Sequence, residues 1–175
     1  NFWGHTGGLK AYRRLMPVAG VEVSALAREQ LEAIAIETWS GIELVPSERT
    51  WAIIRLNWSL EHVHQPSAHF AFIEKHLAPG GRAIICVPNY EGLLYRLAPD
   101  CVELPIHLYH FAPKHLERYA ARHGLRVRSL STFSYPGMFF TATRAGVLPG
   151  TFGGNLGIRE ARHFSHTLNR FDSAG

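Results

Sequence analysis

The sequence predicts an α/β protein with a Rossmann-like, doubly wound, mostly parallel sheet that carries helices on both faces. Three observations support this. Trp51–Leu56 and Ile84–Val87 are almost continuously apolar, as expected of strands that are covered on both sides. Ala68–Leu77 between them repeats apolar residues at helical spacing. Pro79-Gly80-Gly81 then ends the helix and turns the chain back. Together these segments predict a right-handed βαβ unit.

Such units bind ligands beyond the carboxyl ends of their parallel strands. In this chain those ends are Asn57-Trp58-Ser59 and Pro88-Asn89-Tyr90. We therefore expect the functional site there.

The first third of the chain predicts a second strand–helix–strand series. Leu9–Leu15 reads as a short amphipathic helix and Val18–Val23 as a strand. Ser24 can cap the following helix, Ala25–Ala35, by accepting a hydrogen bond from a free N–H of its first turn. Ile36–Ile42 then reads as a strand with a turn at Ser40-Gly41.

The second half begins with Tyr90–Pro105, whose mixed periodicity predicts a short helix and a loop. Residues 90–113 would form an insertion that covers the substrate. A helix follows Pro113 and ends at Gly124, and the alternation in Leu125–Phe133 predicts an edge strand. Met138–Thr143 is a strand or a short helix. Ile158–Phe171 is an amphipathic helix that needs a partner.

Glycines followed by an acid suggest a nucleotide site near the start of the chain. Gly4, Gly7 and Gly8 precede Glu22 by 14 to 18 positions, close to the ~20 of dinucleotide-binding folds. Glycines let a backbone approach its ligand, and the acid accepts hydrogen bonds from ribose hydroxyls. The alternative is an N-terminal tail without a binding role.

Composition limits the classes of function. The formal net charge is +4 without a dense Lys/Arg block, which makes nucleic-acid binding unlikely. No run reaches the ~18 apolar residues of a membrane span. The spacing of Cys86 and Cys101 is not that of a metal-binding cysteine pair. We expect both to be reduced thiols. We expect a single cytoplasmic domain over residues 1–175.

Four motifs in order resemble the class I S-adenosylmethionine-dependent methyltransferases, in the broad group of the ubiquinone-type O-methyltransferases. The resemblance implies S-adenosylmethionine as cofactor and methyl transfer to a small-molecule acceptor. It covers roughly strands two to six of a seven-stranded pattern, so the first and last strands are expected to be missing. The motifs are Leu60-Glu61-His62-Val63, Leu77-Ala78-Pro79-Gly80-Gly81, Val87-Pro88-Asn89 and His107-Leu108-Tyr109-His110-Phe111-Ala112-Pro113.

The resemblance also implies roles for individual residues. His107 and His110 are candidates for a general base, since an unperturbed His titrates near pH 6.5; alternatively they hold the loop through backbone hydrogen bonds. Residues expected on the acceptor side are His62, Asn89, Tyr90 and Tyr109. Residues expected to bind the cofactor are Gly4, Gly7, Gly8, Glu22, Val23, Gly41, Ile42, Asn57 and Trp58.

Glu61 and His62 have a second interpretation. Some relatives hold a divalent metal through a Glu-x-x-Glu-His pattern and a later histidine, but here Trp58 stands where the first acid would be. Glu61, His62 and either His107 or His110 would offer three mixed O/N ligands. We favour a structural or substrate-facing pair, and no metal is predicted.

Two further hypotheses come from other classes. One is an inactive methyltransferase-like module that binds a partner through Ile158–Phe171. The other is a nicotinamide-dependent oxidoreductase, which shares the glycine-rich turn and the ribose acid. An edge left open by a missing strand would also make a homodimer plausible.

Overall fold

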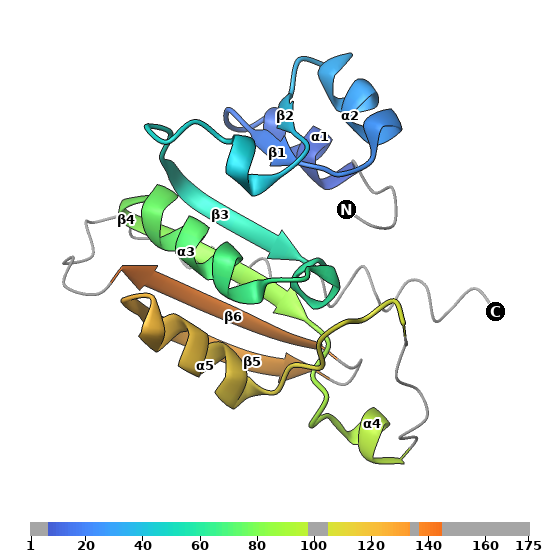
Figure 1. The fold of residues 1–175 in the computed structure, drawn as a ribbon, viewed down its shortest axis with the longest axis vertical. Helices are drawn as coiled ribbons and strands as arrows, with labels where there is room; N and C mark the ends of the chain where they lie inside the picture. Colours follow the sequence, from blue (N-terminus) through green and yellow to red (C-terminus); the bar gives the residue numbers. More distant parts are fainter. Residues whose placement is uncertain (1–6, 98–104, 134–136, 145–175) are drawn as a thin grey trace.

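The computed structural model describes residues 7–97, 105–133 and 137–144, and their strands form two sheets (Figure 1). The larger sheet has the order β3-β4-β6-β5, and the smaller one pairs β1 with β2. The pairs β1–β2 and β3–β4 are parallel. The α/β class predicted from the sequence is confirmed.

The predicted βαβ unit forms the centre of the larger sheet. β3 (Trp51–Asn57) leads through the short 3-10 helix η2 (Leu60–His62) into α3 (Pro66–His76), and β4 (Leu77–Val87) returns parallel to β3. β4 is longer than predicted, because it starts directly where the helix stops. The Pro79-Gly80-Gly81 segment lies within it, and the pairing with β3 shifts register between Trp51 and Ile53.

The far side of the larger sheet is antiparallel. α5 (Pro113–Arg122) leads into β5 (Leu125–Phe133), and β6 (Gly137–Arg144) runs back between β4 and β5. The expectation that the last strand is missing is therefore wrong. Met138–Thr143, which the sequence left open as a strand or a helix, lies within β6 because both neighbouring strands supply backbone partners.

The N-terminal elements form a separate group next to β3, the edge strand of the larger sheet (Figure 1). They are α1 (Gly7–Arg13), β1 (Ala19–Val21), α2 (Ala25–Glu32) and β2 (Glu37–Trp39), followed by the 3-10 helix η1 (Ile42–Leu44). Both strands are shorter than predicted. The Ser24 cap is confirmed, since its Oγ accepts from the N–H of Ala27 at 3.3 Å. Gly4 and the expected helix Ile158–Phe171 lie outside the described residues.

Side chains connect the two sheets. The Trp39 ring of β2 meets the Trp51 ring of β3 edge-on, with centroids 6.2 Å apart. The Arg49 guanidinium lies 5.9 Å and 6.0 Å from these two rings and pairs with Glu37. On α1, Tyr12 accepts a hydrogen bond from Arg55 of β3.

The main core lies between the larger sheet and the helices α3 and α5, which cover the face seen in Figure 1. Because side chains alternate along a strand, Ile54 faces this core while Arg55 faces the opposite side, toward α1. Helices therefore approach the sheet from both faces. The fully buried members of the core are Leu60, Phe70, Ile73, Leu77, Ala83, Ile85, Val87, Leu116, Ala120 and Ala142. Among the described residues, no helix is long and apolar enough to span a membrane.

The turn after α5 depends on Gly124, which has a φ of +61°. A Cβ there would meet no atom within 4 Å, so only the backbone conformation resists a side chain. We expect Gly124→Ala to lower the free energy of unfolding by about 1 kcal/mol, measured by urea denaturation. Gly124→Asn, which tolerates this conformation better, should lose less. Equal losses for both variants would contradict this explanation.

Candidate functional site

Glu22 follows β1 directly and is the most enclosed of the predicted cofactor residues whose burial the structure describes. Its side chain is only 7% exposed, and its Oε1 accepts from the backbone N–H of Ser24 at 2.9 Å. Its carbonyl oxygen accepts from Arg28, which also reaches Val23, while its own N–H donates to Trp39 of β2. The carboxylate is thus held in one orientation at the carboxyl end of a parallel strand, where a bound nucleoside is expected.

The other predicted cofactor residues near β2 form a tight turn. Gly41 precedes η1, and the carboxylate of Glu43 folds back so that one oxygen lies 2.0 Å from where a Gly41 Cβ would be. Val23 is exposed and Ile42 is half-buried. Of the N-terminal glycines, Gly7 and Gly8 open α1 rather than forming a loop before it. The structure therefore corrects the expected helix start at Leu9.

Asn57 is the last residue of β3, beside the end of β4, and Trp58 follows it. The Asn57 Oδ1 accepts from Arg55 at 3.2 Å, and the Trp58 N–H donates to the Cys86 carbonyl at 2.8 Å. Trp58 has a φ of +50°, a conformation that bulky residues rarely adopt. Strained backbone of this kind gathers at ligand sites, so the observation favours a functional role for the turn after β3.

The thiol of Cys86 is held neutral at this strand end. Burial raises its pKa to about 12, with Arg55 opposing the shift and Glu61 adding to it. Only the thiolate reacts with alkylating agents, and at pH 8.5 about one thiol in 3000 is ionised at that pKa. We expect iodoacetamide to leave Cys86 unlabelled in the folded protein and to label it in urea, as followed by peptide mass spectrometry. Rapid labelling of the native chain would contradict this.

Glu61, His62 and His107 come together at the end of β3, although His62 and His107 are 45 positions apart in the sequence. Each offers one ligand atom, and the three atoms lie within 4.8 Å of one another. The His62 and His107 rings meet edge-on with centroids 4.8 Å apart. His110 is not part of this group, so the two histidines predicted as general bases occupy different surroundings.

His110 instead packs with residues after β4. Its ring lies 5.1 Å from that of Tyr90, whose N–H donates to the Phe111 carbonyl at 2.8 Å. That bond closes the ends of the expected insertion, which contains α4 (Leu93–Leu97). Asn89 is buried and its Oδ1 accepts from the N–H of Glu91 at 3.1 Å, a local turn that fixes the start of the insertion.

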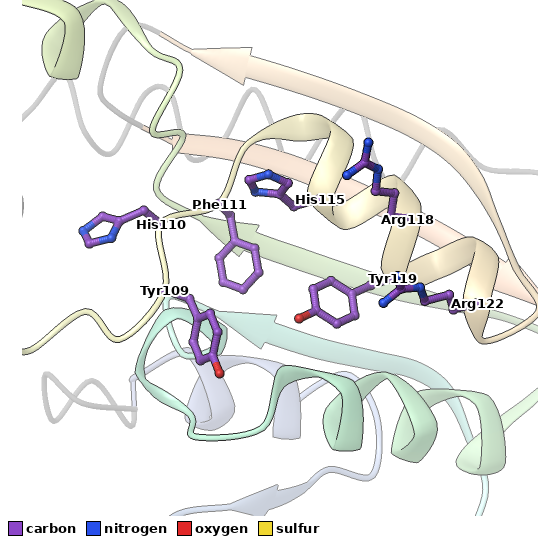
Figure 2. A pocket seen from close by; sticks show the side chains of 7 residues that line it. All are labelled: Tyr109, His110, Phe111, His115, Arg118, Tyr119 and Arg122. Carbon is purple, nitrogen blue, oxygen red and sulfur yellow. The ribbon is translucent and has the colours of Figure 1, made fainter.

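A surface hollow of about 290 Å³ lies beside this loop. Figure 2 shows the aromatic rings of Tyr109, Phe111 and Tyr119 below the side chains of His115 and Arg118, with Arg122 beside Tyr119. Tyr109 also donates its hydroxyl proton to the His64 carbonyl at 3.0 Å. Of the predicted site residues, the hollow gathers only Tyr109 and His110. Those predicted cofactor residues that the structure describes do not line it.

Sequence reasoning missed Arg55 and Tyr12. Arg55 interrupts the apolar run of β3, and its guanidinium contacts both Tyr12 of α1 and Asn57 at the strand end. A lone charge inside a strand that is otherwise apolar was the signal that could have found it, because a half-buried charge needs polar partners. Its partner Tyr12 carries no such local signal.

Comparisons with known proteins identify a family from the sequence and a shared fold from solved structures. A family model described as "Methyltransferase domain" matches residues 9–130. A search of curated proteins found no match. Among solved structures, an S-adenosylmethionine-dependent methyltransferase from Thermotoga maritima superposes with a TM-score of 0.60 at 16% identity, covering 73% of this chain and 72% of that one.

Two further solved structures have named acceptors. The first is 1,6-didemethyltoxoflavin-N1-methyltransferase from Burkholderia thailandensis, with S-adenosylhomocysteine bound; its TM-score is 0.61 at 13% identity, over 81% of this chain and 67% of that one. The second is N,N-8-amino-8-demethyl-D-riboflavin dimethyltransferase from Streptomyces davawensis, with a TM-score of 0.56 at 18% identity, over 73% and 41%. At these identities the likeness concerns the fold.

Proposed function

Because the chain belongs to the S-adenosylmethionine-dependent class I methyltransferases, we propose that it transfers the methyl group of S-adenosylmethionine to a small-molecule acceptor. S-adenosylmethionine is the cofactor of this family, which removes the nicotinamide-dependent oxidoreductase hypothesis. The observation that carries the proposal is the buried, oriented carboxylate of Glu22 at the carboxyl end of β1.

The residues present fit this cofactor. Glu22 would accept hydrogen bonds from the ribose hydroxyls, since its carboxylate is already fixed by Ser24. Asn57 and Trp58 would face the methionine part, and the Trp58 ring favours a nearby cation. The remaining residues proposed for the cofactor are Gly4, Gly7, Gly8, Val23, Gly41 and Ile42. When bound, the cofactor supplies a methyl group already activated by its sulfonium.

The chain's own contribution would be positioning of the acceptor, because the methyl group is already activated and holding the reacting atoms in line lowers the barrier. We propose His62, Asn89, Tyr90 and Tyr109 on the acceptor side, with residues 90–113 covering it. His107 or His110 would take a proton if the acceptor must lose one during attack. The acceptors named for the two solved structures above are small heterocyclic molecules, which supports this class of acceptor.

Calorimetric titration with S-adenosylhomocysteine tests the cofactor half of the proposal. Micromolar binding is expected, and transfer from methyl-labelled S-adenosylmethionine can then be measured across a panel of small phenols, amines and heterocycles. Absence of binding to a sample shown to be folded would overturn the enzyme proposal and favour the inactive binding module. If the chain binds S-adenosylhomocysteine but methylates only protein or RNA, the proposal of a small-molecule acceptor is wrong.

A further inference from the structure

The hollow beside the loop 105–112 combines aromatic and basic side chains, a combination that the proposed methyl transfer leaves unused. None of the described residues that line it is acidic. Its volume of about 290 Å³ is at the lower end of small-molecule sites, which run from about 300 to 1,000 Å³, so it suits a ligand of one or two rings. The aromatic side chains are Tyr109, Phe111 and Tyr119, and the basic ones, all on α5, are His115, Arg118 and Arg122.

The aromatic walls are held in place by contacts outside the hollow. The Tyr109 hydroxyl donates to the His64 carbonyl at 3.0 Å, and the Tyr109 ring stacks on Phe111 with centroids 6.1 Å apart. Tyr119 stacks on Phe70 of α3 with centroids 5.0 Å apart. A ligand ring would therefore meet surfaces that are already ordered, which lowers the entropy cost of binding.

Two hydrogen-bond donors of the hollow remain available to a ligand. The Nδ1 of His115 accepts from the N–H of Ala112 at 3.1 Å, so the ring carries its proton on Nε2 and can donate it. The Tyr119 hydroxyl points toward Tyr109 (Figure 2), and it forms no hydrogen bond with any other described residue. Both groups can donate to an anionic oxygen.

Arg118 and Arg122 add positive charge to the hollow. They are four residues apart on α5, so they share one face of the helix, and both are exposed. Lys114, one turn earlier, pairs with Glu91 at 2.8 Å, whereas neither arginine forms an ion pair within the part of the chain that the structure describes. Glu117, the one acid of α5, does not line the hollow. A guanidinium binds a carboxylate or a phosphate through two parallel hydrogen bonds.

From these contacts we propose that the hollow binds a planar aromatic molecule that carries a carboxylate or phosphate group. The rings of Tyr109 and Tyr119 would contact the ligand ring. Arg122 lies beside Tyr119, and Arg118 lies on the same side of the rings as His115 (Figure 2), so these three side chains would bind the anionic group. Binding there needs neither the cofactor nor methyl transfer, and the proposal is therefore independent of the proposed function.

An NMR titration of the ¹⁵N-labelled full chain with 2-naphthoate and with 2-naphthyl phosphate tests the proposal. We expect saturable shifts centred on residues 109–122, with a Kd of about 1 mM or lower for a ligand of this size. The tighter of the two ligands identifies the preferred anion. The uncharged 2-naphthamide and the non-aromatic cyclohexanecarboxylate should each bind at least about tenfold more weakly, because each lacks one of the two recognised groups.

The matched variants remove the same charge from two different places. The double variant Arg118→Gln and Arg122→Gln should weaken 2-naphthoate binding at least about tenfold, since both guanidinium groups are lost. The double variant Arg126→Gln and Arg128→Gln is the control, because these arginines are exposed on β5 and do not line the hollow. It should bind like the unaltered protein.

Equal binding by the two double variants would overturn the proposal, as would equal binding of 2-naphthoate and 2-naphthamide. Shifts centred away from the hollow, or no saturable shift in a folded sample, would also overturn it. Binding of S-adenosylhomocysteine, measured separately, distinguishes these results from failure of the proposed function.

Discussion

Glu22→Ala is expected to weaken S-adenosylhomocysteine binding by about 100-fold. A hydrogen bond to a charged group is worth about 1.5–3 kcal/mol, and two ribose hydroxyls would lose their acceptor together. A loss of about 3 kcal/mol corresponds to about two decades in Kd. The buried carboxylate is oriented by the N–H of Ser24, and the alanine side chain offers no acceptor in its place. Calorimetric titration gives the two dissociation constants directly.

Two companion variants make the Glu22 result specific. Glu22→Gln keeps one acceptor oxygen and should bind with intermediate affinity. Glu29→Ala removes an exposed acid from the neighbouring helix α2 and should leave the affinity unchanged. A Glu22→Ala protein that binds like the unaltered chain would show that the ribose is held elsewhere.

Phe70→Ala should cause the largest loss of stability among single substitutions in the main core. Phe70 lies on α3, is fully buried, and stacks on Tyr119 of α5 with centroids 5.0 Å apart and ring planes 12° apart. Truncating a buried Phe costs about 3–5 kcal/mol, because transfer energy is lost and a cavity is left. Urea denaturation should show the midpoint falling, with the slope unchanged.

The control for Phe70 is Leu93→Ala on α4, where the side chain is 68% exposed. Its free energy of unfolding should change by less than about 0.5 kcal/mol. A Phe70→Ala protein that loses less than about 1 kcal/mol would mean that α3 and α5 close over the vacated space. In that case α3 and α5 would be packed on the sheet less rigidly than the stacking of Phe70 on Tyr119 suggests.

The elements that the sequence predicted best are those whose pattern is local. Trp51–Leu56 and Leu125–Phe133 carry a continuous apolar run and a clear alternation, and they coincide with β3 and β5 almost to the residue. Met138–Thr143 has no such period. It became a strand through its partners: β5 directly precedes it, whereas β4 lies far away in sequence. Pairing with a distant strand such as β4 leaves no local mark.

The same distinction holds for the site. Glu22 could be found from its spacing to the glycines and its place after a strand, although its role with the cofactor stays a prediction. Whether His107 or His110 lies next to Glu61 could not be decided from the sequence, because the placement of His107 depends on main-chain bonds from Leu108 and Tyr109 to the Glu61 carbonyl. The strained turn at Trp58 was likewise invisible, since its φ follows from the bond to Cys86 on the neighbouring strand.

The side-chain junction between the two sheets has a consequence for cooperativity. A two-stranded ribbon is only marginally stable alone. Within the described residues, side-chain contacts of Trp39, Arg49 and Tyr12 connect the β1–β2 ribbon to β3, and no backbone hydrogen-bond ladder joins them. The local opening that exposes the amides of β1 and β2 to hydrogen exchange should therefore cost less free energy than the opening that exposes those of β3 and β4. A ligand that contacts both Glu22 and the end of β3 would bind only when both regions are folded. Its binding should therefore make the two regions unfold together and slow amide exchange in β1 and β2.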